Sequence, residues 1–218
     1  MLEAKRALLL AISHELRSPL TRARLNTELL DEEGGARERR SALLRDLQVM
    51  ADLVTDLLES ERLGQGHQAL HLETTAPADL VREVVQAMGK PVHVDLQDVQ
   101  PLALDRARVR LLLRNLLDNA LRHTPEGAEA PTVTLRATEL GIDLRVRDRG
   151  PGVDDEALAH LTEAFWRPDA SRERSTGGVG LGLYLCQLVA QAHGGRLLLR
   201  NTRPGFEAVV FLPFARAR

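Results

Sequence analysis

The first third of the chain carries two amphipathic patterns of helical period, separated by the pair Gly34-Gly35. Before the glycines, apolar residues fall on one stripe at about 100° per residue, and after them they recur at alternating steps of four and three. The stripe comprises Leu9, Ile12, Leu16, Leu20, Ala23 and Leu30, and the seam comprises Leu43, Leu47, Met50, Val54 and Leu57. The pattern predicts two long helices joined in an antiparallel hairpin.

A single hairpin of this kind cannot bury both of its apolar stripes. A second copy would cover them in a four-helix bundle, so the pattern predicts a homodimer. The alternative is a monomer in which the hairpin packs on the rest of the chain. Because Gly64 and Gly66 interrupt the second helical pattern, we expect a linker there. We therefore expect a dimerisation domain over residues 1–64 and a second domain over residues 69–218.

The second domain mixes short alternating segments with helical ones. Strands are expected over 69–74, 92–96, 131–137, 142–146, 196–200 and 208–212, and helices over 78–88, 105–122 and 179–193. Residues 151–178 show neither period and are expected to be irregular. Adjacent strand pairs late in the chain favour helices on one face of a sheet. The expected fold class is α+β: an N-terminal helical hairpin followed by a C-terminal α/β sandwich.

Composition and charge narrow the classes of function. The 218 residues include 29 Lys and Arg against 31 Asp and Glu, a net charge of −2, which argues against a nucleic-acid partner or contact with a membrane surface. Cys186 is the only cysteine, which excludes an intrachain disulfide and a cysteine-cluster metal site. No apolar run approaches the roughly 18–20 residues of a membrane span. We therefore expect a cytoplasmic location, with a membrane-anchored parent cut before Met1 as the open alternative.

His14 is the first candidate for chemistry. It lies on the first predicted helix nearly opposite the apolar stripe, so it is expected to face solvent. Glu15 follows it, and Ser18 lies one turn later at i+4. Pro19 removes a backbone hydrogen bond and is expected to bend the helix. Taken alone, an exposed histidine on a helix is usually just solvated.

The helix predicted over 105–122 carries a second group of candidates. Asn115 and Asn119 are i,i+4 neighbours on one flank, with Arg122 beside them and His123 next in the chain. Two amide oxygens and a cation suit a magnesium–phosphate group, because Mg²⁺ prefers oxygen ligands and usually retains substrate phosphates. Taken alone, two asparagines on a helix flank would be explained by solvation.

Two glycine-containing segments complete the candidate site, and no Walker P-loop sequence occurs. Asp148 stands at the end of a predicted strand, where its carboxylate could accept a hydrogen bond from an exocyclic amine such as that of adenine. Gly150 and Gly152 would let the backbone approach the ring. The segment 177–183 opens the last helix, and amides at such a helix start can bind phosphate oxygens.

Together these segments resemble those of bacterial sensor histidine kinases. Ser13-His14-Glu15-Leu16-Arg17-Ser18-Pro19-Leu20 resembles their phosphoacceptor box, with Ser18 where threonine is commoner. Residues 114–123, 148–152 and 177–183 resemble, in this order, the N, G1 and G2 boxes of the catalytic domain, and Phe165-Trp166-Arg167 matches the F box. That domain belongs to the superfamily of gyrase B, Hsp90 and MutL. The resemblance covers essentially the whole chain.

The resemblance implies a role for each motif. His14 would accept a phosphoryl group from ATP and pass it to an aspartate of a response-regulator receiver domain. Asn115 and Asn119 would bind Mg²⁺, and Asp148 would bind adenine. The phosphates would contact Arg122 and Arg167, and residues 151–178 would form a lid. The further residues expected against the nucleotide are His123, Gly150, Gly152, Gly178, Gly180, Leu181 and Gly182.

Residue chemistry favours a kinase over an ATPase. Superfamily ATPases carry a water-activating glutamate at the position that matches Asn115, and an amide cannot take a proton from water. The γ-phosphoryl group would then await a nucleophile such as the neutral imidazole of His14, with Glu15 accepting a hydrogen bond from its other ring nitrogen. By resemblance, Ser18 could orient water for phosphatase activity toward the regulator. A catalytically silent dimeric scaffold and a gyrase-like ATPase are the alternatives.

Overall fold

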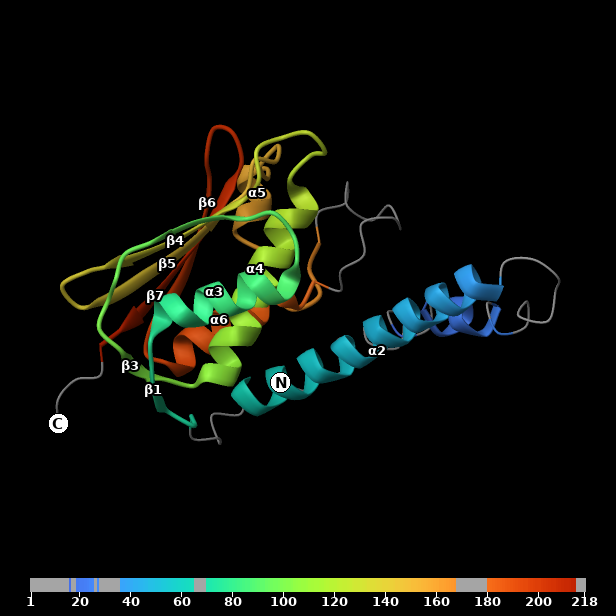
Figure 1. The fold of residues 1–218 in the computed structure, drawn as a ribbon, viewed down its shortest axis with the longest axis horizontal. Helices are drawn as coiled ribbons and strands as arrows, with labels where there is room; N and C mark the ends of the chain where they lie inside the picture. The colour runs from blue at the N-terminus through green and yellow to red at the C-terminus, as the bar shows by residue number, and fades with distance from the viewer. Residues whose placement is uncertain are drawn as a thin grey trace. The chain divides into compact units, whose positions relative to one another are not determined.

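A computed structural model describes residues 16, 19–25, 27, 36–64, 70–167 and 180–214 of the chain (Figure 1). The chain divides into two units, Met1–Glu61 and Arg62–Arg218. Residues 16, 19–25 and 27 are helical, and the helix α2 covers Ala36–Gly64. The predicted turn at Gly34-Gly35 and most of the predicted linker lie outside the described residues.

An ion pair joins the two helices of the N-terminal unit. Arg22 and Asp46 lie 2.9 Å apart, and the Asp46 side chain is only 11% exposed. The buried positions of α2 are Asp46, Leu53 and Ser60, which follow one another at steps of seven. Leu47 and Val54 belong to the predicted seam. Each directly follows one of these buried positions in the chain, and both are exposed. Within one chain, the first helix thus covers only part of the apolar surface of α2.

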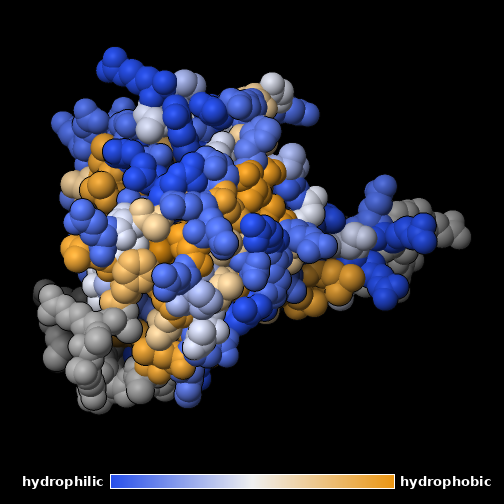
Figure 2. Space-filling model, turned by 60° about the vertical axis from the view of Figure 1, so that its left-hand side comes forward, coloured by the Kyte–Doolittle hydropathy of each residue, from blue (hydrophilic) through white to orange (hydrophobic). Residues whose placement is uncertain are grey.

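Large apolar side chains remain exposed on this helical unit. Figure 2 shows hydrophobic side chains there among hydrophilic ones. The exposed set comprises Leu20, Leu25, Leu44, Leu47, Val49, Val54 and Leu58. Leu20, which the sequence places on the apolar stripe, is 60% exposed, whereas Ala23 of the same stripe is buried. No described helix is both long and apolar enough to cross a lipid bilayer.

The second unit is built on a five-stranded sheet in the order β2-β4-β5-β7-β6. Its strands are β2 (His93–Leu96), β4 (Thr132–Ala137), β5 (Gly141–Arg147), β6 (Arg196–Asn201) and β7 (Phe206–Pro213). β2 pairs with β4 in parallel, and the other neighbours are antiparallel. β1 (Glu73–Thr75) and β3 (Leu102–Leu104) form a separate antiparallel pair.

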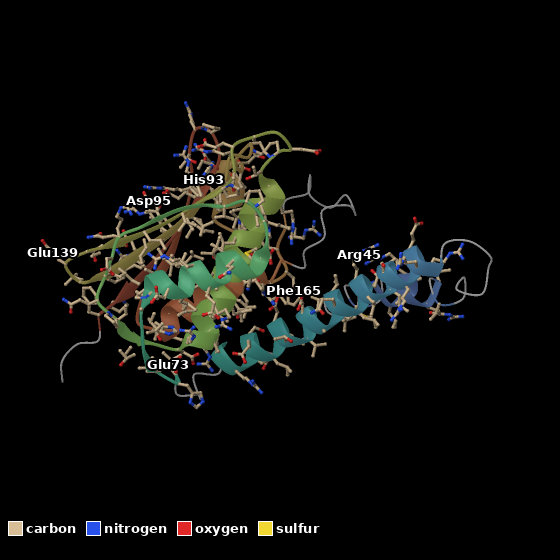
Figure 3. The ribbon with its side chains drawn as sticks, viewed as in Figure 1. Arg45, Glu73, His93, Asp95, Glu139 and Phe165 are labelled. Carbon is tan, nitrogen blue, oxygen red and sulfur yellow. The ribbon has the colours of Figure 1, made fainter. Side chains whose placement is uncertain are left out.

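Three helices cover one face of this sheet: α3 (Pro77–Met88), α4 (Arg106–His123) and α6 (Gly182–Ala192) (Figure 1). The inner residues of β4 and β5 are buried against them, among them Val133, Leu135, Ile142 and Leu144. The opposite face is mostly polar, and His93 and Asp95, labelled in Figure 3, lie on it beside Thr132 and Thr134 of β4. The predicted α+β fold with helices on one face is confirmed.

Helix α4 follows its sequence pattern closely. Asp105 caps it by accepting a hydrogen bond from the Arg108 amide at 3.1 Å. The predicted buried face is confirmed, because all its members are 3% exposed or less: Val109, Leu112, Leu113, Leu116 and Ala120. This burial leaves the flank with Asn115 and Asn119 directed away from the centre of the core.

Four elements differ from the prediction. Residues 151–178 were expected to be irregular, but the short helix α5 covers Asp155–Leu158. α6 begins at Gly182 rather than at 179, because Gly180 has φ +76° and cannot belong to a right-handed helix. β3 was not expected, because three residues are too few to show an alternating pattern. β1 is shorter than the predicted strand and reaches Thr75.

His193 connects the ends of α4 and α6. Its Nε2 accepts a hydrogen bond from the Asp105 amide at 3.1 Å, so the Nδ1 that lies 2.8 Å from the Val189 carbonyl carries the proton. Burial lowers the pKa of His193, while the Val189 carbonyl and Asp105 oppose this and Arg108 adds to it. Protonation of Nε2 would place a second donor against the Asp105 amide.

We expect acid to destabilise the second unit through this histidine. The pKa of His193 is lower folded than unfolded, so its contribution is complete above the ordinary histidine value of about 6.5 and is lost as the pH falls below it. Unfolding followed by fluorescence of Trp166, the single tryptophan, reports on this unit. The stability of His193→Gln should depend less on pH than that of the wild type, and His93→Gln, at an exposed position of β2, is the control. Equal slopes for wild type and His193→Gln would contradict this.

Candidate functional site

Asp148 follows β5 and is the buried centre of the candidate site. It is 3% exposed, and its Oδ1 accepts hydrogen bonds from the amides of Gly150 at 2.8 Å and Phe206 at 3.0 Å. Burial raises the pKa of Asp148, and the two amides, His123 and Arg147 oppose this. Both hydrogen bonds use Oδ1, so Oδ2 can accept a hydrogen bond from a ligand.

Backbone segments pack very closely around Asp148. A Cβ on Gly150 would lie 2.5 Å from the His123 carbonyl oxygen, and one on Gly205, at φ +101°, would lie 2.1 Å from the Asp148 carbonyl oxygen. Both positions therefore require glycine. Sequence reasoning singled out Gly150 but missed Gly205 and Phe206. A glycine in the turn between the last two strands is the only local signal for them.

Basic side chains gather where α4 ends. Partial burial lowers the pKa of Arg122, Asp118 raises it, and the charge of Arg167 lowers it again. Burial also lowers the pKa of His123. The charge of Asp148 raises this pKa, and the charges of Arg122 and Arg167 lower it. His123 thus lies within electrostatic range of Asp148, Arg122 and Arg167. A bound anion would relieve the mutual repulsion of the cations.

The start of α6 lies against the asparagine flank of α4. A Cβ on Gly182 would lie 3.7 Å from the Asn115 side chain. The Asn115 Nδ2 is buried and has no hydrogen-bond partner within the described part of the chain, which is expected of a group that binds a ligand. No cluster of three or more His, Cys, Asp or Glu among the described residues could hold a metal ion. A cation here would thus depend on amide and phosphate oxygens, a donor set that suits Mg²⁺.

A backbone hydrogen bond joins Phe165 and Gly180, the residues on either side of positions 166–179. The Phe165 amide donates to the Gly180 carbonyl at 2.9 Å, and Figure 3 shows where Phe165 lies. Phe165 has φ +65°, an uncommon value for a residue with a side chain. A Cβ on Gly180 would lie 2.8 Å from the Trp166 carbonyl oxygen. Leu181 is buried, and Gly182 begins α6.

Four predicted site residues lie outside the described residues: His14, Glu15, Ser18 and Gly178. Pro19, which belongs to the predicted phosphoacceptor box, is helical and buried. Asn119 is half-buried on α4, one turn after Asn115. Gly152 lies in the loop after Asp148 with φ +80°.

Comparison with known families gives the decisive observation. Residues 4–66 match the His Kinase A (phospho-acceptor) domain, and residues 104–216 match the histidine kinase-, DNA gyrase B- and HSP90-like ATPase family. The chain belongs to the sensor histidine kinases. The resemblance seen in the sequence motifs is confirmed at the level of the family, and residues 104–216 of this histidine kinase chain form its ATP-binding domain.

Individual relatives support the same assignment. The kinase chain is 31% identical over 226 residues to the signal transduction histidine-protein kinase BaeS of Escherichia coli K12, covering 98% of this chain and 48% of the relative. It is 36% identical over 203 residues to the sensor protein RstB of the same organism, covering 89% and 45%. The chain thus spans about half the length of these curated relatives.

Solved structures show the same fold. The Acinetobacter baumannii histidine kinase AdeS matches with a TM-score of 0.76 at 21% identity, over 93% of this chain and 98% of that one. Full-length ShkA, solved in complex with AMPPNP, matches with a TM-score of 0.69 at 26% identity, over 97% of this chain and 46% of that one.

Proposed function

We propose that this chain phosphorylates itself on His14 with the γ-phosphate of ATP and passes the group to an aspartate of a response regulator. The convergence of a buried carboxylate, Asp148, with the basic side chains of Arg122, His123 and Arg167 is the observation that carries the proposal. A carboxylate beside a cluster of cations is complementary to a nucleotide, which has an amine-bearing base and an anionic tail.

The adenine end is assigned to Asp148. Its Oδ1 is held by two backbone amides, and Oδ2 would accept the hydrogen bond from the exocyclic amine. Gly150 and Gly152 would allow the ring to approach the backbone. Burial raises the pKa of Asp148, while the two amides, His123 and Arg147 oppose this shift and favour the charged carboxylate.

The phosphate end is assigned to Arg122, Arg167 and His123, with backbone amides of Gly178, Gly180, Leu181 and Gly182 at the start of α6. Asn115 and Asn119 would hold Mg²⁺ through their amide oxygens, and the unpartnered Asn115 Nδ2 supports a ligand at this flank. When bound, Mg²⁺ would neutralise negative charge on the phosphates.

The transfer step follows from the chemistry of imidazole. A ring nitrogen of neutral His14 would attack the γ-phosphorus, forming an N–P bond as the bond to the β-phosphate oxygen breaks and ADP leaves. The proton on the other ring nitrogen would pass to Glu15. Asn115 cannot act as a base for water, so transfer to histidine is favoured over hydrolysis in the pocket.

The apolar side chains left exposed on the helical unit support a homodimer, in which a second copy would cover them. The response regulator as partner follows from the family. The phosphatase role of Ser18, the cytoplasmic location of these residues and an inner-membrane anchor on a longer parent stay predictions.

Incubation with ATP labelled at the γ-phosphate tests the proposal. We expect the chain to become labelled in the presence of Mg²⁺ and to lose labelling when the ion is chelated, because the neutral amides of Asn115 and Asn119 cannot replace the charge of the ion at the phosphates. The modification should be labile to acid, as phosphoramidates are. Steady release of phosphate without labelled protein would instead indicate a gyrase-like ATPase. Nucleotide binding without either product would indicate a silent scaffold.

A further inference from the structure

The end of the β6–β7 pair lies against the loop that carries Asp148. Asn201 and Phe206 are the last register pair of these two strands. Phe206 holds the start of the loop, because its amide donates to the Asp148 Oδ1 at 3.0 Å and its carbonyl accepts from the Asp148 amide at 2.9 Å. The loop is therefore tied to β7 at its first residue.

Asn201 holds the other end of the same loop through its side chain. Its Oδ1 accepts from the Val153 amide at 2.9 Å, and its Nδ2 donates to the Val153 carbonyl at 2.5 Å. Nδ2 also donates to the Asp155 Oδ1 at 3.2 Å. One carboxamide thus satisfies both backbone groups of Val153, as a neighbouring strand would.

Gly152, the residue before Val153, lies close to the Asn201 side chain. Gly152 has φ +80°, and a Cβ there would lie 2.9 Å from the Asn201 Oδ1. The positive φ already favours glycine at position 152, and a side chain there would also displace the Asn201 carboxamide. Because the Asn201 side chain is exposed, its loss should cost little core packing and should mainly release the loop.

We propose that Asn201 is a positioning residue for the adenine pocket. By clamping Val153 while Phe206 holds Asp148, it keeps residues 148–153 in the one shape that presents the Asp148 carboxylate and the Gly150–Gly152 backbone to the base. This inference rests on the proposed nucleotide site and names a residue outside the motifs of the sequence. Asn201 itself acts through the loop and not on the substrate.

Asn201→Asp is the sharpest variant. It keeps the size of the side chain and the acceptor for the Val153 amide, but it removes the donor and places a carboxylate against two acceptors, the Val153 carbonyl and Asp155. We expect the apparent dissociation constant for ATP to rise about tenfold. The rate of phosphate incorporation at saturating ATP and the melting temperature should stay unchanged. Asn201→Ala should weaken ATP binding in the same direction.

Two further variants separate positioning from a general structural role. Thr202→Ala is the matched control, because the Thr202 hydroxyl lies in the same turn but donates to the Pro204 carbonyl. It should bind ATP as the wild type does. Combining Asn201→Asp with Asp155→Asn restores a donor opposite the new carboxylate and should recover part of the affinity.

The outcomes distinguish this inference from the proposed function. Wild-type ATP affinity in both Asn201 variants would overturn the positioning role, and so would an equal loss in Thr202→Ala. A fall in melting temperature with no rescue by Asp155→Asn would show an ordinary structural contact. If the wild-type chain itself fails to bind ATP, the proposed function fails first.

Discussion

Replacing His14 by alanine is expected to abolish incorporation of the γ-phosphate of ATP, while nucleotide binding is retained. Alanine offers no nucleophilic nitrogen, so no N–P bond can form. The nucleotide site is assigned to residues of the second unit, so the substitution leaves Asp148 and its surroundings intact. Labelled ATP measures the transfer, and equilibrium binding of an ATP analogue measures the site.

His93→Ala is the matched control for this experiment. His93 is an exposed histidine of β2, and it lies on the polar face of the sheet away from the helices (Figure 3). This variant should be labelled like the wild type. Label that still enters the His14→Ala protein would refute the assignment of the acceptor.

Replacing Asp148 by asparagine is expected to weaken ATP binding about a hundredfold, with little change in the fold. The amide oxygen can still accept from the amides of Gly150 and Phe206, as Oδ1 does now. The amide nitrogen would then face the ligand, where it places a donor against the exocyclic amine of adenine. Phosphate incorporation at low ATP should fall in proportion, and titration with ATP measures the effect.

Asp143→Asn controls for loss of a carboxylate in the same strand. Asp143 lies on β5 and pairs with Arg145 at 2.9 Å on the polar face of the sheet. It should bind ATP normally. Equal affinity of Asp148→Asn and the wild type would remove Asp148 from the adenine pocket, whatever the outcome for His14.

The regular elements with a clear period could be read from the chain. The buried face of α4 follows the helical spacing of its leucines, and the alternation of β4 and β5 follows from having only one face covered. β3 and α5 were not predicted, because three or four residues are too few to show a recognisable pattern. α6 begins later than predicted because the backbone of Gly180 turns against Phe165. This contact joins two separate segments of the chain, so no local pattern indicates it.

For the site, the amino-acid sequence by itself determined the family, through motifs whose residue types and order carry the chemistry: the box around His14, the asparagines of α4 and the aspartate–glycine loop. Only the tertiary structure decided what holds that loop. Asp148 is hydrogen-bonded to Phe206, 58 residues later in the chain, and Val153 to Asn201, 48 residues later. Such contacts follow from strand pairing in space, and neither Phe206 nor Asn201 carries a local pattern that announces its partner.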